Sequence, residues 1–194
     1  MMGEDRKIRL ALFASGSGTN AERIIHHFES DPDIKVAMLL SNRPDAYALV
    51  RATQHGIPTT VFTREAFEDG SVTAVLSGAG ITHLVLAGFL WLVPSTLIAR
   101  YANRIINIHP ALLPAFGGKG MYGMKVHEAV KASGANETGI TIHQVNERYD
   151  EGQILFQASC PVIPSDSPDD IASKVHALEY AHYPRVIGDW VRSH

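Results

Sequence analysis

The feature that most constrains how this chain can fold is the alternation of short apolar runs with segments of helical spacing. Residues 8–14 (IRLALFA), 34–40 (IKVAMLL) and 83–87 (HLVLA) are near-continuous apolar runs, typical of strands covered on both faces of a parallel sheet. Apolar residues recur at helical spacing in the segments 20–29 and 45–55. The alternation predicts an α/β fold, with an open, mostly parallel Rossmann-like sheet and helices on both faces.

The same signals extend to residue 108 and then change. Two further strands are expected at 59–62 and 104–108, and two further helices at 64–76 and 94–101. After them we expect a glycine-rich loop at 115–123 and a helix at 124–133. A late antiparallel strand pair should follow at 138–145 and 152–158, and then a C-terminal helix at 168–190 that is bent at Pro184. The chain contains no repeat and no linker-like tract, so we expect a single domain over residues 1–194.

The composition excludes several classes of partner. The formal net charge of −3 and the lack of any Lys/Arg run give no general attraction to nucleic acid. No apolar run reaches the ~18 residues that a membrane helix requires, and the polar start MMGEDRK does not resemble a signal peptide. The single cysteine, Cys160, cannot form an internal disulfide. We therefore expect a cytoplasmic protein that binds neither nucleic acid nor membranes.

A glycine-rich loop, ASGSGTNA at 14–21, connects the first expected strand to the first expected helix. Its glycines would let the backbone approach a phosphate, and the start of the helix offers unpaired N–H groups. Ser17, Thr19 and Asn20 add side-chain donors around Gly18. The alternative is a tight strand-to-helix turn in which Thr19 or Asn20 caps the helix.

The same loop satisfies the glycine spacing of a dinucleotide site, through Gly16, Gly18 and Ala21. Such a site also needs an acidic residue at the end of the second strand, where it holds the ribose hydroxyls. Here the second strand ends in LSNR at 40–43, with no carboxylate before Asp45. We therefore expect no NAD, and a loop that suits a single phosphomonoester.

The strand at 104–108 carries two polar residues at its end. Asn107 and His109 are two residues apart, so both should point to the same face. Ligands bind at the carboxyl ends of the strands in an open parallel sheet, and Pro110 follows at once. This location favours a catalytic pair over a structural histidine.

A catalytic imidazole usually works with a carboxylate that orients it. The turn at 146–151 offers Glu147, Asp150 and Glu151, and spacing alone does not choose among them. Asp150 could equally serve only to shape the turn before Gly152.

Other candidate residues lie nearby or form no pattern. Thr141 and His143 share one face of the strand before that turn and could reach the same region, although His143 could equally be a half-buried strand residue. The remaining histidines, including the pair His26 and His27, have no metal-ligand spacing. We therefore expect no metal.

Four segments together carry a family resemblance. FASGSGTN at 13–20, LVLAGF at 84–89, NIHPALLPAFGGKGMYG at 107–123 and YDEGQILFQ at 149–157 occur in this order. With them, essentially the whole chain closely resembles the phosphoribosylglycinamide formyltransferases, the folate-dependent transformylases of purine synthesis. The resemblance implies small-molecule substrates: the formyl group of 10-formyltetrahydrofolate would pass to the amine of glycinamide ribonucleotide.

The resemblance also implies roles for individual residues. The family's catalytic trio falls on Asn107, His109 and Asp150, and positions that support the aspartate and its water fall on Thr141 and His143. The substrate-phosphate loop falls on Ser17, Gly18, Thr19 and Asn20, and the glutamate that holds the ribose falls on Glu179. The folate contacts fall on Phe89, Leu90, Trp91, Leu92 and Val93 and on Asn146, Glu147 and Arg148.

One residue departs from the family pattern, because Trp91 stands where an arginine is often found. The outer part of the folate is therefore expected to be held differently. The phosphate would be bound by the N-terminal half, about residues 1–100, and the folate and the reacting groups by residues 101–194.

In the implied mechanism the substrate amine attacks the formyl carbon, Asn107 and His109 hold the oxyanion, and Asp150 takes or relays the proton. The alternatives are a formyltetrahydrofolate deformylase, a methionyl-tRNA formyltransferase and, from another class, a non-catalytic nucleotide-binding module. The resemblance leaves a monomer and a homodimer equally open.

Overall fold

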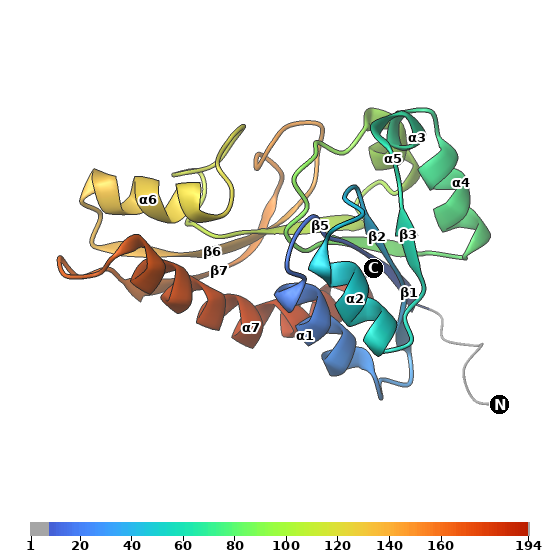
Figure 1. The fold of residues 1–194 in the computed structure, drawn as a ribbon, viewed down its shortest axis with the longest axis horizontal. Helices are drawn as coiled ribbons and strands as arrows, with labels where there is room; N and C mark the ends of the chain where they lie inside the picture. Colours follow the sequence, from blue (N-terminus) through green and yellow to red (C-terminus); the bar gives the residue numbers. More distant parts are fainter. Residues whose placement is uncertain (1–7, 194) are drawn as a thin grey trace.

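The computed structural model describes residues 8–193, so the polar start in which we recognise no signal peptide lies outside the described residues (Figure 1). A seven-stranded sheet in the order β3-β2-β1-β4-β5-β6-β7 forms its centre. Five strands are parallel: β1 (Ile8–Phe13), β2 (Ile34–Ser41), β3 (Thr59–Val61), β4 (His83–Leu86) and β5 (Ile105–His109). β6 (Glu137–Gln144) and β7 (Ile154–Pro161) extend the sheet in antiparallel fashion, which confirms the expected fold class.

Helices cover both faces of this sheet (Figure 1). One face carries α1 (Thr19–Phe28), α2 (Tyr47–Gln54) and α7 (Pro168–Arg192), and α6 (Met124–Ser133) packs against α7. The other face carries three short helices, α3 (Arg64–Glu68), α4 (Ser71–Gly78) and α5 (Ser95–Arg100). Each face therefore has its own hydrophobic core.

The central strands are rich in apolar residues on both faces because they supply both cores. In β1, Leu10 and Leu12 enter the core under α1 and α7, whereas Ala11 and Phe13 enter the core under α3, α4 and α5. Alternate residues of a strand point to opposite faces, so a strand that is covered twice cannot show a polar face.

Two of the expected helices differ in detail from the sequence-based prediction. The segment 64–76 forms two helices instead of one, because Gly70 adopts a left-handed conformation (φ 92°) and starts α4 after Asp69 has ended α3. Pro94 caps α5 from outside the helix instead of occupying its first turn. The C-terminal helix begins at a capping box of Ser167 and Asp170 and continues through Pro184.

The order of the strands creates a switch point between β1 and β4, where the chain turns from one half of the sheet to the other. The loops that leave these strands meet there: Ser15 N–H donates to the Gly88 carbonyl at 3.0 Å, and Leu90 N–H donates to Ser15 Oγ at 3.1 Å. Crevices at such switch points are the usual ligand sites of open α/β sheets.

Candidate active site

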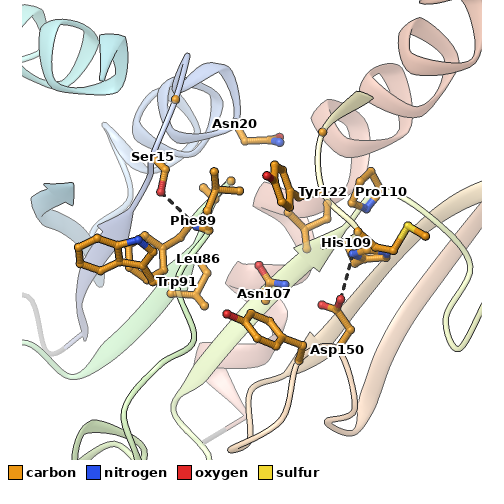
Figure 2. Close-up of a pocket in the computed structure, with 18 of the residues that line it drawn as sticks. Ser15, Asn20, Leu86, Phe89, Trp91, Asn107, His109, Pro110, Tyr122 and Asp150 are labelled. Carbon is orange, nitrogen blue, oxygen red and sulfur yellow. Dashed lines mark hydrogen bonds and ion pairs between the residues drawn. The ribbon is translucent and has the colours of Figure 1, made fainter. Parts of the chain in front are cut away.

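A cavity of about 680 Å³ opens at the carboxyl ends of β1, β4 and β5. Its wall combines the glycine-rich loop after β1, the segments after β4 and β5, the loop before α6 and the turn after β6. Figure 2 shows Ser15 and Asn20 at its upper end, Phe89 and Trp91 to the left, and His109 with Asp150 to the right. The cavity thus lies at the strand ends, where the sequence analysis places the site.

Asn107 and His109 share one face of β5, as their spacing predicts. Both line the cavity, and the residue on the same face one pleat earlier is Ile105, in the core of the α3–α5 side. The antiparallel register places His143 opposite Asn107 and Thr141 opposite His109. Neighbouring strands therefore deliver four polar side chains to one end of the sheet.

The imidazole of His109 is almost completely buried, and each of its nitrogens lies near an oxygen atom. Nε2 lies 2.7 Å from the Phe116 carbonyl, which can only accept, so Nε2 carries a proton. Nδ1 lies 3.5 Å from Asp150 Oδ2. Burial lowers the pKa of His109 and outweighs the raising effects of Asp150 and of the Phe116 carbonyl. The lowered pKa favours the neutral ring, whose unprotonated Nδ1 faces the Asp150 carboxylate without a hydrogen bond between them.

Asp150 joins the two histidines from the turn after β6. Its Oδ2 accepts the Gly118 N–H at 2.9 Å, and its Oδ1 lies 3.5 Å from His143 Nε2. Burial raises the pKa of this carboxyl, but the His143 contact, the proximity of His109 and the Gly118 N–H together hold it below the ordinary value. Asp150 is thus an ionised carboxylate, and its left-handed backbone (φ 56°) aims it inward from the turn.

His143 connects Asn107 to this carboxylate. Its Nδ1 donates to the Gln144 carbonyl at 2.9 Å, and its Nε2 lies 3.2 Å from Asn107 Nδ2 as well as near Asp150. With its proton on Nδ1, the ring accepts from the Asn107 amide through Nε2 and so orients that amide, while the same nitrogen lies beside the Asp150 carboxylate.

Thr141 is placed differently from what the resemblance implied. Its buried hydroxyl donates to the Ala111 carbonyl at 2.7 Å and accepts N–H bonds from Leu113 and Gln157, both at 2.9 Å. These bonds hold the turn after β5 and do not reach Asp150, so Thr141 shapes the backbone beside the site. The support predicted for the aspartate comes from His143.

The glycine-rich loop is not a side-chain-capped turn. Gly18 occupies the N-cap of α1 in a left-handed conformation (φ 75°), and no side chain of the described residues caps the helix. The first helical bond runs from Glu22 N–H to the Gly18 carbonyl at 2.9 Å, so the N–H groups of Thr19, Asn20 and Ala21 have no partner within the helix. The alternative in which Thr19 or Asn20 caps the helix is therefore wrong.

Glu179 of α7 reaches the same end of the cavity. It is 6% exposed, its Oε2 accepts from Asn20 Nδ2 at 2.9 Å, and burial raises its pKa. Asn20 Oδ1 is buried and has no hydrogen-bond partner among residues 8–193. This acceptor is therefore left unpaired under the cavity wall.

The segment Phe89–Val93 lines the cavity after β4, as predicted. Phe89 and Trp91 pack in an aromatic cluster with Phe62 and Phe67, and the Arg64 guanidinium lies 4.2 Å from the centre of the Trp91 ring. Trp91 therefore carries a cation on the face of its ring.

The predicted folate turn is only partly at the cavity. Asn146 and Arg148 line it, whereas Glu147 is exposed and lies outside the lining, so the predicted contact of Glu147 is not supported. The sequence also missed several lining residues: Arg43, Met121, Tyr122, His127, Tyr149 and His176. The sequence predicted only a glycine-rich loop at 115–123, and no spacing rule connects His127 or His176 to Asn107.

The expectation of no metal depended on sequence spacing. The structure brings Glu22, His26 and His55 together, outside the cavity lining, with potential ligand atoms all within 4.8 Å of one another. Within residues 8–193, no helix is both long enough and apolar enough to span a bilayer.

Comparison with protein families gives a match to the formyl transferase family over residues 8–187. A chloroplastic phosphoribosylglycinamide formyltransferase of Arabidopsis thaliana is 44% identical over 193 residues, which cover 95% of this chain. A phosphoribosylglycinamide formyltransferase of Haemophilus influenzae is 39% identical over 92% of this chain and 85% of its own length. The chain spans 66% of the Arabidopsis protein, and 60% of a similar protein of Vigna unguiculata.

Solved structures agree with the sequence comparisons. The crystal structure of a phosphoribosylglycinamide formyltransferase of Anaplasma phagocytophilum matches with a TM-score of 0.85 at 31% identity, covering 93% of this chain and 85% of that one. A glycinamide ribonucleotide transformylase of Symbiobacterium toebii matches with a TM-score of 0.85 at 33% identity, covering 95% and 87%.

Proposed function

Because the chain belongs to the formyl transferase family, we propose that it transfers the formyl group of 10-formyltetrahydrofolate to the amine of glycinamide ribonucleotide. The observation that carries this proposal is the linked set of Asn107, His143, Asp150 and His109 in the wall of one cavity. It combines an amide donor, an ionised carboxylate and an unprotonated imidazole nitrogen, the groups that acyl transfer to an amine requires.

The nucleotide substrate fits the end of the cavity beside α1. The free N–H groups at the start of α1 suit a phosphate, and Ser17 and Thr19 line the cavity beside them. The Glu179 carboxyl, which Asn20 Nδ2 holds, is an acceptor for ribose hydroxyls. The substrate would thus lie with its phosphate at the glycine-rich loop and its amine directed towards Asn107.

The folate fits the opposite wall, where apolar side chains gather. The segment Phe89–Val93 offers an aromatic and aliphatic surface for a pterin ring, with Asn146 at the adjacent turn. Trp91 with Arg64 above it offers a stacked cation near the outer part of the cofactor, in place of the usual arginine.

Each residue of the set has a proposed part in the reaction. As the amine forms its bond to the formyl carbon, Asn107 donates an N–H to the oxyanion that develops. Asp150 takes the proton that leaves the amine, directly or through one water, and passes it to His109 Nδ1. The imidazolium then places a positive charge near the oxyanion and gives its Nδ1 proton to the departing folate nitrogen as the old carbon–nitrogen bond breaks.

The compartment and partners proposed with this function are the cytoplasm and the two small molecules. The single cysteine, Cys160, is free and half-buried, in keeping with a reducing environment. The proposal involves no metal and no NAD in the transfer itself.

The experiment that tests this proposal identifies the molecule that accepts the formyl group. The purified protein is incubated with 10-formyltetrahydrofolate, with and without glycinamide ribonucleotide, and the products are separated by mass. We expect formylglycinamide ribonucleotide in amounts equal to the tetrahydrofolate formed. Formate released at the same rate without the nucleotide would instead identify a deformylase, and formylation of methionyl-tRNA would identify the tRNA enzyme.

A further inference from the structure

A cluster of metal-ligating side chains lies outside the cavity, where α1 meets the end of α2. Glu22 and His26 are one turn apart on α1, and His55 follows the last residue of α2. Potential ligand atoms of these three residues lie within 4.8 Å of one another. None of the three lines the cavity, so the cluster is separate from the proposed transfer reaction.

The carboxylate of Glu22 already divides its two oxygens between different partners. Oε2 is bound by the Arg51 guanidinium, while Oε1 lies 3.5 Å from His55 Nε2. Two ligand atoms at ~2.0–2.2 Å from a tetrahedral zinc ion are about 3.3–3.6 Å apart. The separation of Oε1 and Nε2 therefore fits two positions around one ion, and Arg51 can keep its own oxygen as an outer hydrogen bond that orients the ligand.

The third ligand, His26, lies against the second. The rings of His26 and His55 are 4.4 Å apart at their centres and almost perpendicular. The side chains of Glu22, His26 and His55 are 27%, 55% and 21% exposed, so an ion reaches them from solvent without unfolding of either helix.

We propose that Glu22, His26 and His55 form a binding site for a divalent transition-metal ion of the zinc type. Two imidazoles and one carboxylate suit Zn²⁺, whereas Mg²⁺ and Ca²⁺ select oxygen ligands. Three protein ligands leave the fourth position to water, as expected at an exposed site.

The site has a structural consequence for the proposed phosphate loop. A bound ion joins α1 to the end of α2, two elements that are distant in sequence, and such clips stabilise a fold by restricting the unfolded chain. Arg51, which holds Glu22, also donates from Nε to the Ser17 carbonyl at 2.9 Å. The ion therefore supports the arrangement in which Arg51 holds the loop in place.

The test measures Zn²⁺ binding to chelator-treated protein by calorimetry, with Co²⁺ absorption as a report of ligand geometry. One equivalent of Zn²⁺ should bind to the wild type. The variants His26→Gln and His55→Gln should each bind Zn²⁺ about tenfold or more weakly. His27→Gln is the matched control, because His27 is the exposed neighbour of His26 and is not part of the cluster. Zn²⁺ should raise the melting temperature of the wild type and of His27→Gln, but not of His55→Gln.

Two results would overturn the proposal. One is an affinity for Zn²⁺ that is the same in His55→Gln as in the wild type. The other is binding that His127→Gln abolishes and His55→Gln does not, which would place the ion in the cavity. Melting curves of the metal-free variants show whether each variant is still folded, so that weaker binding can be assigned to the lost ligand.

Discussion

At the scale of single residues, the chemistry depends on which atoms of the polar set are already engaged. The Phe116 carbonyl fixes the proton of His109 on Nε2, and so leaves Nδ1 to face Asp150. His143 fixes one side of Asn107 through an N–N distance of 3.2 Å. An asparagine Nδ2 carries two hydrogens, so the second remains for the oxyanion.

Asn107→Ala tests the oxyanion role. Loss of one such donor typically costs about 10²–10³ in kcat, or ~2.7–4 kcal/mol of transition-state stabilisation. Steady-state kinetics should show this loss, with an unchanged melting temperature. Asn136→Ala is the matched control, because Asn136 is exposed and outside the cavity lining. Unchanged turnover in Asn107→Ala would remove the amide from the mechanism.

Single residues also mark the limit of what the sequence could predict at the site. The shared face of Asn107 and His109 followed from the two-residue period of a strand, and it was right. The choice of Asp150 over Glu147 and Glu151 needed the family resemblance, because a turn has no periodicity. The contacts of His109 with Phe116, and of Asp150 with Gly118, depend on how a glycine-rich loop folds back, for which the sequence has no rule.

At the scale of elements, the junction of β1 and α1 requires a glycine at position 18. Its φ of 75° is unfavourable for other residues, and a Cβ atom there would lie 2.4 Å from Ala48 Cα on α2. Backbone cannot yield to such a contact, so α1 and α2 can approach only over a glycine.

Gly18→Ala should therefore destabilise the protein by roughly 2 kcal/mol or more, the sum of about 1–2 kcal/mol for the left-handed conformation and the cost of moving α2. Urea unfolding measures the difference. Gly16→Ala is the control in the same loop, since a Cβ atom there meets nothing within 4 Å. Equal stability of the two variants would contradict the proposed contact.

The elements themselves were predictable where periodicity was strong. The near-continuous apolar runs identified β1, β2 and β4, because strands that serve two cores have no polar face. The prediction of one helix over 64–76 was wrong. The apolar residues keep helical spacing across Gly70, but the left-handed backbone of Gly70 separates two helices. Propensity alone could not decide whether that glycine would be tolerated or would break the helix.

At the scale of the whole molecule, acid stability reflects the burial of His127, a residue of α6 that lines the cavity. Burial, with the nearby His176 and His109, lowers the pKa of His127 from 6.5 to about 4. An unfolded chain takes up the proton below pH 6.5, whereas the folded protein does so only near pH 4. The stabilising contribution is thus complete above pH 6.5 and is lost as the pH falls to about 4.

His127→Gln removes this titration. Between pH 7.5 and 4, the free energy of unfolding of the wild type should fall by up to roughly 3 kcal/mol more than that of the variant. Urea unfolding at a series of pH values gives both curves, and His27→Gln serves as an exposed control. Parallel curves for the wild type and His127→Gln would show that His127 does not titrate with unfolding.

The central claim is that Asp150, and not another carboxylate of its turn, carries the proton during formyl transfer. The most direct measurement compares kcat and KM of Asp150→Asn with those of Glu147→Gln and Glu151→Gln. Both glutamates are exposed and lie outside the cavity lining, so they are matched controls. We predict a loss of about 10²–10⁴ in kcat for Asp150→Asn with little change in KM, and near wild-type turnover for both controls. Full turnover in Asp150→Asn, or an equal loss in either glutamate variant, would contradict the account.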